Sequence, residues 1–176
     1  ALLKNQLVSA DQFSMAVNIS AAQFAQPNFA DSVFIILEKT GVPAKMLKLE
    51  VTESIVITEM ESTITKMQLL QRGGVSFAMD DFGTGYSSLT YLKRLPVDVL
   101  KIDRSFINDA THASNDVEIL RAIIAMAQSL KLGIIAEGVE NQGQLDFLAG
   151  EGCHIYQGYL FSKPVPLDEF SVLLGG

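Results

Sequence analysis

The most constraining feature of the sequence is a regular alternation of short apolar segments with longer stretches of helical spacing. Each apolar segment has the length of a buried strand, and the stretch after it repeats its apolar residues every three or four positions. Such alternation is typical of parallel strands whose connecting helices pack outside the sheet. The predicted strands are residues 14–19, 47–51, 75–79, 98–102, 133–137 and 154–158.

The helical stretches are bounded by residues that stop or start helices. Gly41 suits the left-handed position that ends a helix, and Pro43 prevents that helix from resuming. Asn141 suits the capping position before a helix. The predicted helices cover residues 28–40, 64–70, 88–95, 116–130 and 167–174, with a further one through Leu145 and Leu148.

Two architectures fit βα units of this kind, an open doubly wound sheet and a (β/α)8 barrel. A barrel needs two more units than the 176 residues contain. Residues 1–7 resemble the end of a helix that begins without a cap, so we expect the remaining units upstream.

Charge and cysteine content limit the classes of function. The net charge is −7 with no cluster of lysine or arginine, which argues against bulk electrostatic capture of DNA or RNA. No apolar run reaches the length of a membrane span, and no signal-peptide pattern is present. The single cysteine, Cys153, cannot form an internal disulfide, which favours a reducing, cytoplasmic setting.

Two adjacent carboxylates, Asp80 and Asp81, follow the third predicted strand and precede a loop with two glycines. Neighbouring residues on a regular strand point to opposite faces, so we expect the strand to stop between these two if both serve one ligand. Two acids beside a buried strand are costly unless a cation lies there. The alternative is an Asx-type turn that caps the next helix.

Every predicted strand places a polar or charged residue at its carboxyl end, where α/β folds build their sites. These residues are Asn18, Glu50, Asp80 with Asp81, Lys101 with Asp103 just beyond, Glu137 and Gln157. The carboxylates of Glu50, Asp80, Asp81 and Glu137 and the carbonyl of Asn18 are hard oxygen donors, which suit Mg²⁺ or Mn²⁺ and suit copper or structural zinc poorly. Adjacent aspartates, one of them able to bridge, suggest a pair of metal ions that activates a water against a phosphoryl group.

These residues lie in motifs that resemble the EAL-domain family of cyclic di-GMP phosphodiesterases. The motifs run from Asn18-Ile19-Ser20 to Phe161-Ser162-Lys163-Pro164, and their order is more specific than any one of them. Between these two come Leu49-Glu50-Val51-Thr52-Glu53-Ser54, Asp80-Asp81-Phe82-Gly83-Thr84-Gly85, Lys101-Ile102-Asp103, Ala136-Glu137-Gly138-Val139-Glu140 and Gln157-Gly158-Tyr159.

The resemblance implies a modified (β/α)8 barrel that hydrolyses cyclic di-GMP to linear pGpG with two Mg²⁺ or Mn²⁺ ions. Asn18, Glu50 and Asp80 would hold the first metal, and Asp80 would bridge to a second that Asp81 and Glu137 help bind. Lys101 would position the attacking water, with Glu137 as general base. Gln157, Asp103 and Glu140 would support the site or touch substrate. Glu53 would anchor the loop 82–88, which in this family links metal occupancy to dimerisation.

On this resemblance, residues 1–176 are the C-terminal three-quarters of one EAL domain, and the N-terminal strands are absent from the chain. The Glu-Ala-Leu motif that names the family would lie upstream with its metal-binding glutamate, so this fragment is not expected to be fully competent by itself. The resemblance also implies a homodimer and an upstream sensory or cyclase domain, and it leaves a membrane anchor in the parent protein open.

Each predicted site residue also has a structural interpretation. Asn18 suits a turn at a strand end, Glu50 could pair with Lys48 or Lys101, and Lys101 could be a simple counter-ion. Gln157 could be a hydrogen-bonding group of the core. Glu53 and Glu140 suit helix starts, and Asp103 suits an N-cap. At the level of function, the alternatives are a catalytically inactive cyclic di-GMP receptor and a regulatory or dimerisation module.

Overall fold

The computed structural model describes residues 8–9, 13–53, 55, 60–83, 89–108 and 115–175. Its centre is a six-stranded sheet in which every neighbouring pair is parallel and the strands follow chain order. An open doubly wound sheet reverses its strand order part-way, so the sequential order supports the barrel prediction. The strands are β1 (Met15–Asn18), β2 (Leu47–Thr52), β3 (Ser76–Phe82), β4 (Val99–Ile102), β5 (Gly133–Glu137) and β6 (Tyr156–Gln157).

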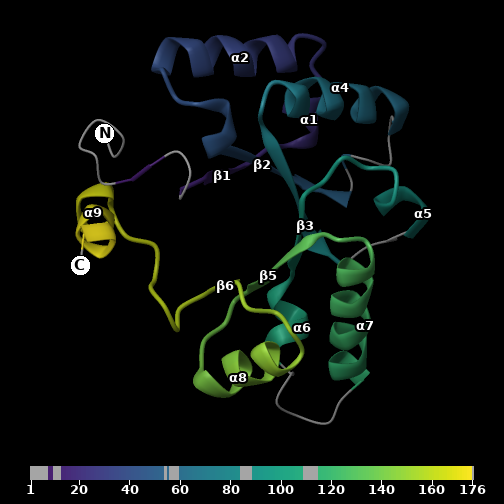
Figure 1. Ribbon diagram of the computed structural model, residues 1–176, viewed down its shortest axis with the longest axis vertical. Coiled ribbons are helices and arrows are strands. Elements are labelled where there is room, and N and C mark those ends of the chain that lie inside the picture. The colour runs from purple at the N-terminus through teal and green to yellow at the C-terminus, as the bar shows by residue number, and fades with distance from the viewer. Residues whose placement is uncertain are drawn as a thin grey trace.

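The helices that connect the strands lie on one side of the sheet, with α2 and α4 at one end of the arc and α7 and α8 at the other (Figure 1). The alternation of strand and helix is therefore that of part of a (β/α)8 barrel. The helical elements are α1 (Ala21–Phe24), α2 (Phe29–Thr40), η1 (Ala44–Met46), α4 (Met60–Arg72), α5 (Leu89–Leu92), α6 (Arg104–Asn108), α7 (Asn115–Ser129), α8 (Gln142–Gly150) and α9 (Leu167–Gly175).

Local sequence signals set two of the helix boundaries as predicted. Helix α2 ends at Gly41, whose φ of 68° is the left-handed conformation that glycine adopts without a steric penalty. Helix α8 begins with a capping box, in which the Asn141 side chain accepts from the Gln144 N–H and the Gln144 side chain accepts from the Asn141 N–H. Helix α6 was not predicted, because its five residues are too few to show a periodic pattern.

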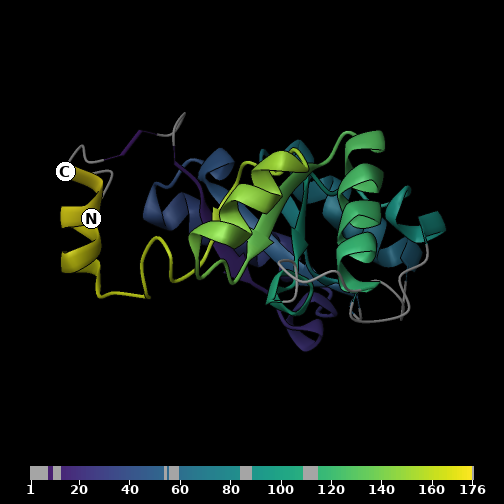
Figure 2. The same cartoon turned by 90° about the horizontal axis from the view of Figure 1, so that it is seen from below.

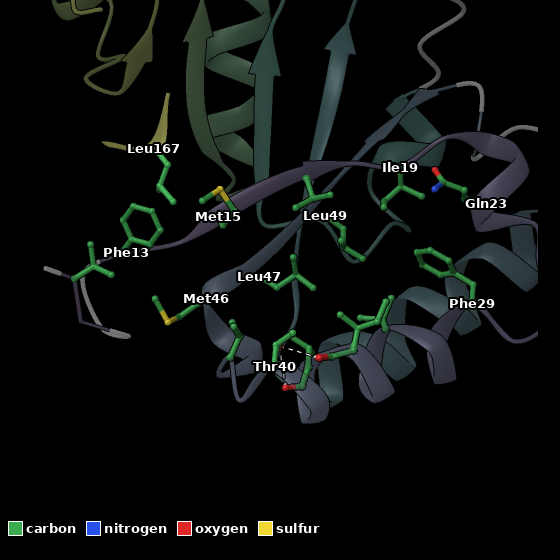
Figure 3. Close-up of a pocket in the computed structure, with 16 residues that line it drawn as sticks. Phe13, Met15, Ile19, Gln23, Phe29, Thr40, Met46, Leu47, Leu49 and Leu167 are labelled. Atoms are coloured by element: carbon green, nitrogen blue, oxygen red, sulfur yellow. Dashed lines mark hydrogen bonds between the residues drawn. The ribbon is translucent and has the colours of Figure 1, made fainter. Parts of the chain in front are cut away.

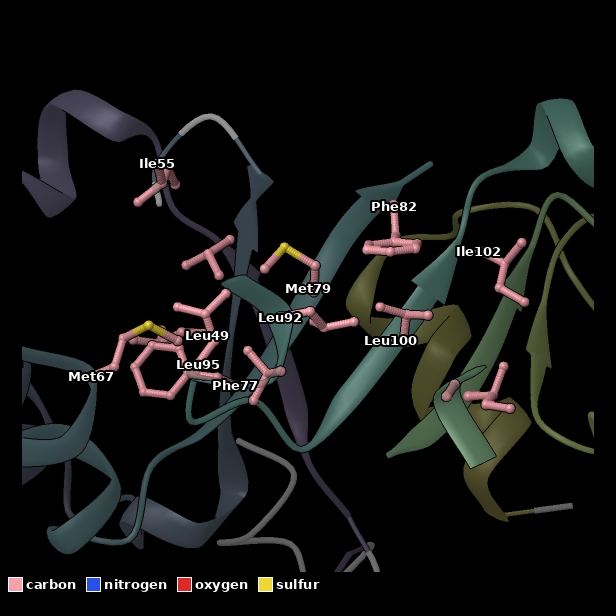
Figure 4. Close-up of a cluster of buried hydrophobic side chains, with 14 of the residues drawn as sticks. Leu49, Ile55, Met67, Phe77, Met79, Phe82, Leu92, Leu95, Leu100 and Ile102 are labelled. Atoms are coloured by element: carbon pink, nitrogen blue, oxygen red, sulfur yellow. The ribbon is translucent and has the colours of Figure 1, made fainter. Parts of the chain in front are cut away.

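The hydrophobic core lies between the sheet and its helices. Alternate residues of the central strands, such as Leu49, Phe77 and Leu100, are at most 2% exposed and belong to one cluster with side chains of the helices (Figure 4). Burying side chains of this size contributes about 1.5–3 kcal/mol each. Because strand residues alternate between two faces, the residues between these positions point to the opposite, inner face of the curved sheet.

Within the described residues, the helices cover the outer face of β1 only in part. Met15 and Val17 are 48% and 40% exposed, although both are apolar. They line an apolar groove between β1 and α2 that also takes in Phe29, Leu47 and Leu49 (Figure 3). Apolar side chains that belong to the helix-facing side of the sheet are therefore partly exposed at this edge.

Helix α9 stands apart from the helices that cover the sheet, as both views show (Figures 1 and 2). None of the residues 167–174 is fully buried, and Val172 is 74% exposed. The ring of Phe170 lies 6.4 Å from that of Phe13, between centroids. Within the described ranges, no helix is both long enough and apolar enough to cross a membrane.

Candidate active site

The inner face of the sheet gathers charged side chains from four adjacent strands. Leu49, Met79 and Leu100 face the core, so their neighbours Glu50, Asp80 and Lys101 must face inward. Glu137 follows the core residue Ala136 on β5 and therefore also points inward. The carboxyl ends of parallel strands meet at one rim, and these four side chains meet there as predicted.

Lys101 is the centre of this cluster. Its Nζ lies 2.8 Å from Glu50 Oε2, 2.9 Å from Asp80 Oδ1 and 2.6 Å from Glu137 Oε1. Lys101, Glu50 and Asp80 are 4%, 7% and 8% exposed. One buried ammonium thus donates to three carboxylates from three strands. Of the two partners considered for Glu50, the structure places Lys101 in contact with it.

The conformation of Asp81 corrects the predicted end of β3. We expected the strand to stop between Asp80 and Asp81, but it continues to Phe82. Met79 is in register with Leu100, and Phe82 with Ile102, so β3 carries one extra residue in a β-bulge. Asp81 has a φ of 51°, and its N–H donates to Asp80 Oδ1 at 3.1 Å.

The bulge brings the two aspartates toward one point. Aspartate is among the residues that tolerate the left-handed conformation. One oxygen each from Asp80, Asp81 and Glu137 lies within 4.8 Å of the others. The two adjacent carboxylates can therefore reach one bound ion although the strand continues. Phe82, the next residue, faces the core again and is 6% exposed.

The outer strands place the two predicted amides beside the cluster. Asn18 on β1 is in register with Glu50 on β2, and its side chain is exposed. Gln157 on β6 is in register with Glu137, and its Nε2 donates to Glu137 Oε1 at 2.5 Å. Gln157 is exposed, so it is not the buried core amide that was the alternative. Together the two amides extend the rim at both ends.

Asp103 and Glu140 lie in the segments that follow β4 and β5. Asp103 Oδ1 accepts from the N–H of Ser105 at 3.0 Å and from its hydroxyl at 2.6 Å, which is an N-cap for α6. Glu140 is exposed before α8, and its backbone N–H donates to Gln144 Oε1 at 2.8 Å. The capping interpretation of Asp103 thus holds, and it is compatible with a role beside the site.

Glu53 reaches the loop that follows the aspartates. Its Oε1 accepts from the Gly83 N–H at 3.1 Å. Gly83 has a φ of 95°, a conformation that bends the chain just after Phe82. This is the contact expected of a loop anchor at the start of the loop, whose remainder, 84–88, lies outside the described residues.

Burial and neighbouring charges shift the pKa values of the cluster. Burial opposes the charged form of Lys101, but hydrogen bonds to Glu137, Glu50 and Asp80 outweigh it and raise its pKa. Burial raises the pKa of Glu137, and Asp80 and Glu50 add to the rise while Lys101 opposes it. Burial and the charge of Asp80 also raise the pKa of Asp81. Lys101 therefore remains an ammonium that donates hydrogen bonds and cannot act as a base at neutral pH.

Sequence reasoning missed two residues next to the site. Gln144 is 4% exposed and joins the turn at Glu140 to Ile107 O at the end of α6, with Nε2 at 3.4 Å from that oxygen. Arg104 lies in a hollow with Glu140 and Gln157. The sequence does carry one indication of the sharp turn after Glu137, which is the glycine at position 138. Gly138 has a φ of 70°, a conformation that other residues rarely adopt.

Comparison with known proteins identifies relatives of this chain. The sequence model of the EAL domain matches residues 1–164. The chain is 48% identical over 161 residues to the cyclic di-GMP phosphodiesterase NbdA of Pseudomonas aeruginosa, covering 92% of this chain and 21% of that protein. The chain thus spans about a fifth of the length of this relative.

Solved structures share the fold. That of the PaMucR phosphodiesterase in complex with c-di-GMP superposes with a TM-score of 0.86 at 44% identity, covering 91% of this chain and 65% of that one. The complex of Klebsiella pneumoniae BlrP1 with manganese and cyclic di-GMP at pH 9.0 gives 0.81 at 29% identity, covering 92% and 41%.

Proposed function

Because this chain belongs to the EAL-domain family, we propose that the domain from which it comes hydrolyses cyclic di-GMP to linear pGpG with the help of Mg²⁺ or Mn²⁺. The observation that carries the proposal is the meeting of Glu50, Asp80 and Glu137 around Lys101 at the carboxyl rim of the sheet. Buried charges are retained where they are paired or bind cations, and titratable groups with shifted pKa values gather at functional sites.

The donor set fits hard divalent cations. Asp80, Asp81 and Glu137 offer oxygens close enough together to share an ion, and Glu50 and Asn18 lie on the adjacent strands. Asn18, Glu50 and Asp80 would hold one metal, and Asp80, Asp81 and Glu137 a second. Two such ions lower the pKa of a bound water and offset charge on the phosphoryl oxygens.

The protein's own residues would orient the water and take its proton. The Lys101 ammonium donates to the three carboxylates of the cluster. Where a metal ion takes over one of these carboxylates, the released N–H would orient the attacking water. Glu137, with its raised pKa, is the strongest candidate to accept the proton of that water. The water oxygen bonds to phosphorus, the bond to the 3′ oxygen breaks, and that oxygen leaves as a hydroxyl after taking a proton from solvent. Gln157 would hold the Glu137 carboxylate in place.

We propose the same domain boundaries as the sequence indicates, with residues 1–176 forming the C-terminal three-quarters of one EAL domain in a cytoplasmic, dimeric protein that carries an upstream sensory or cyclase domain. The partly exposed apolar face of β1 supports this, because further barrel units would bury Met15 and Val17. The chain covers 21% of the relative NbdA, which is therefore long enough to contain such domains as well.

The test is hydrolysis of cyclic di-GMP by the full-length protein with Asp80→Asn, which removes one charge and keeps the shape. We expect loss of turnover by at least about a hundredfold, since removal of one group that stabilises transition-state charge has costs of that order. The control is Asp98→Asn at the opposite end of β4, which is outside the site. Turnover unchanged in Asp80→Asn would refute the proposal. Binding of cyclic di-GMP without turnover by the unmodified protein would instead identify a receptor.

A further inference from the structure

One buried polar side chain beside the site has no part in the chemistry proposed above. Gln144 is 4% exposed, although glutamine is mostly a surface residue. It belongs to the capping box that starts α8 at Asn141. A capping box needs only an acceptor at this position, and glutamate supplies one as well as glutamine does. The burial and the amide nitrogen of Gln144 therefore require a second explanation.

The hydrogen bonds of Gln144 determine how its amide is oriented. Its Oε1 accepts from the N–H of Glu140 at 2.8 Å and from that of Asn141 at 3.2 Å. Two backbone donors can meet only the oxygen, so the nitrogen must point the other way. There Nε2 donates to the carbonyl of Ile107 at 3.4 Å. Ile107 lies in the last turn of α6, where helix carbonyls have no partner within the helix.

This bond joins the segments that follow two adjacent strands. Helix α6 comes directly after Asp103, the residue that caps it at the end of β4. The turn at residues 138–140 follows β5. Lys101 and Glu137 lie at the ends of these two strands, with Nζ and Oε1 2.6 Å apart. Gln144 thus connects the backbone beyond Lys101 to the backbone beyond Glu137.

The sheet supports the backbone of Glu137 from one side. Glu137 is in register with Gln157 on β6. On the other side, the pairing of β4 with β5 ends at Ile102 and Ala136, one residue before Glu137. The bond from Gln144 to α6 takes the place of that pairing just beyond the end of the strands.

We propose, resting on the function proposed above, that Gln144 is a positioning residue that sets the distance between the Lys101 ammonium and the Glu137 carboxylate. Its Nε2 holds the turn after Glu137 to α6, and its Oε1 holds the same turn to the start of α8. Without the bond from Nε2, the turn moves away from α6 and Glu137 moves with it. A displacement of about 1 Å at an active site can cost about a hundredfold in rate.

Kinetics of the full-length protein with Gln144→Glu test the bond from Nε2. At alkaline pH the new carboxyl group is ionised, so it still accepts from Glu140 and Asn141 but has no proton to donate to Ile107. We expect kcat for cyclic di-GMP in saturating Mg²⁺ to fall by about tenfold to a hundredfold with KM little changed, because Glu137 acts in the chemical step.

The matched control is Gln23→Glu. Gln23 holds the same position in the capping box of α1, which starts at Ser20, and it is exposed. The same substitution there should leave kcat at the wild-type value. This comparison separates the link to α6 from the capping of a helix.

A second variant keeps the test decisive if a buried carboxylate prevents folding. Gln144→Met removes both hydrogen-bonding atoms without adding a charge, and its kcat should fall at least as far as that of Gln144→Glu. Rates are measured well below the Tm of each variant, which calorimetry gives. A role in stability alone would lower Tm and leave the kcat of the folded protein unchanged.

A double-mutant cycle shows through which residue Gln144 acts. Glu137→Gln is measured by single turnover with excess protein, alone and together with Gln144→Met. If Gln144 acts by placing Glu137, the second substitution should lower the residual rate by no more than about twofold. Full multiplication of the two separate losses would mean that Gln144 acts elsewhere, and would overturn the inference.

The outcomes distinguish this inference from the proposed function. Active wild-type protein with an unchanged kcat in Gln144→Met, or with a rise in KM alone, would overturn the inference and leave the function standing. Wild-type protein without hydrolysis would overturn the function. Crystals of Gln144→Met would then decide the inference, which predicts Lys101 Nζ and Glu137 Oε1 beyond hydrogen-bond distance. A distance equal to that of the wild type would overturn it.

Discussion

Replacement of Lys101 by methionine removes the ammonium that lies among Glu50, Asp80 and Glu137, and keeps a side chain of similar length. The ammonium is 4% exposed and lies within 2.9 Å of each carboxylate. Removing one partner of a buried charge pair costs about 3–5 kcal/mol. For a domain of 150–250 residues, each kcal/mol lowers Tm by roughly 2–4 °C, so we expect a decrease of about 6–20 °C in EDTA.

The pH and metal dependence of this loss follow from the charges. The pKa of Lys101 is raised in the fold, so its stabilisation is complete at neutral pH and is lost only as the pH rises through that raised value. In Lys101→Met the loss of stability should become smaller as the pH falls, because protonation neutralises the carboxylates that remain. Mg²⁺ should stabilise the variant more than the wild type, because a divalent cation takes over the missing charge.

The assay is differential scanning calorimetry of the full-length protein, in EDTA and in saturating Mg²⁺, with the exposed Lys39→Met as a matched control. Lys39→Met should change stability by no more than about 0.5 kcal/mol. Melting of Lys101→Met at the wild-type temperature in EDTA, or equal stabilisation of both proteins by Mg²⁺, would contradict this role of Lys101.

Three further predictions concern the residues around the cluster. Gly158→Ala should lower both Tm and turnover, because the new Cβ would lie 2.1 Å from Val139 O; activity assays and calorimetry measure both, and a normal enzyme would contradict the close approach. Because burial raises the pKa values of Asp81 and Glu137, apparent Mg²⁺ affinity should fall as the pH is lowered, with proton release on binding; calorimetry in buffers of different ionisation enthalpy detects it, and pH-independent binding would argue against it. Glu53→Gln should weaken the hydrogen bond from the Gly83 N–H and reduce turnover several-fold at low Mg²⁺, more than at saturation; an equal reduction at both concentrations would point to a purely structural role.

Strand positions and the inward set of charges were predictable from the sequence. Period-two alternation places Glu50, Lys101 and Glu137 opposite the core residues beside them, and the parallel arrangement brings strand ends to one rim. Asn141 caps the start of α8 and Gly41 ends α2, as their residue types predict. These features are local or follow from a single rule of topology.

Other features depend on tertiary structure and could not be predicted. The bulge at Asp81 arises from the register between β3 and β4, which leaves no periodic signal in β3 itself. Helix α6 is short, and the contact of Arg104 with Gly138 joins two segments that are far apart in the sequence. The role of Gln144 rests on a contact with Ile107, 37 positions earlier in the chain.

The central claim is that Asp80, Asp81 and Glu137 converge to bind a divalent cation. Anomalous scattering from Mn²⁺ in crystals of the full-length protein tests it most directly. The account predicts an anomalous peak about 2.1 Å from an Asp80 oxygen and within ligand distance of Asp81 or Glu137. Well-diffracting crystals grown in saturating Mn²⁺ with no peak at this rim, or with peaks only elsewhere, would contradict it.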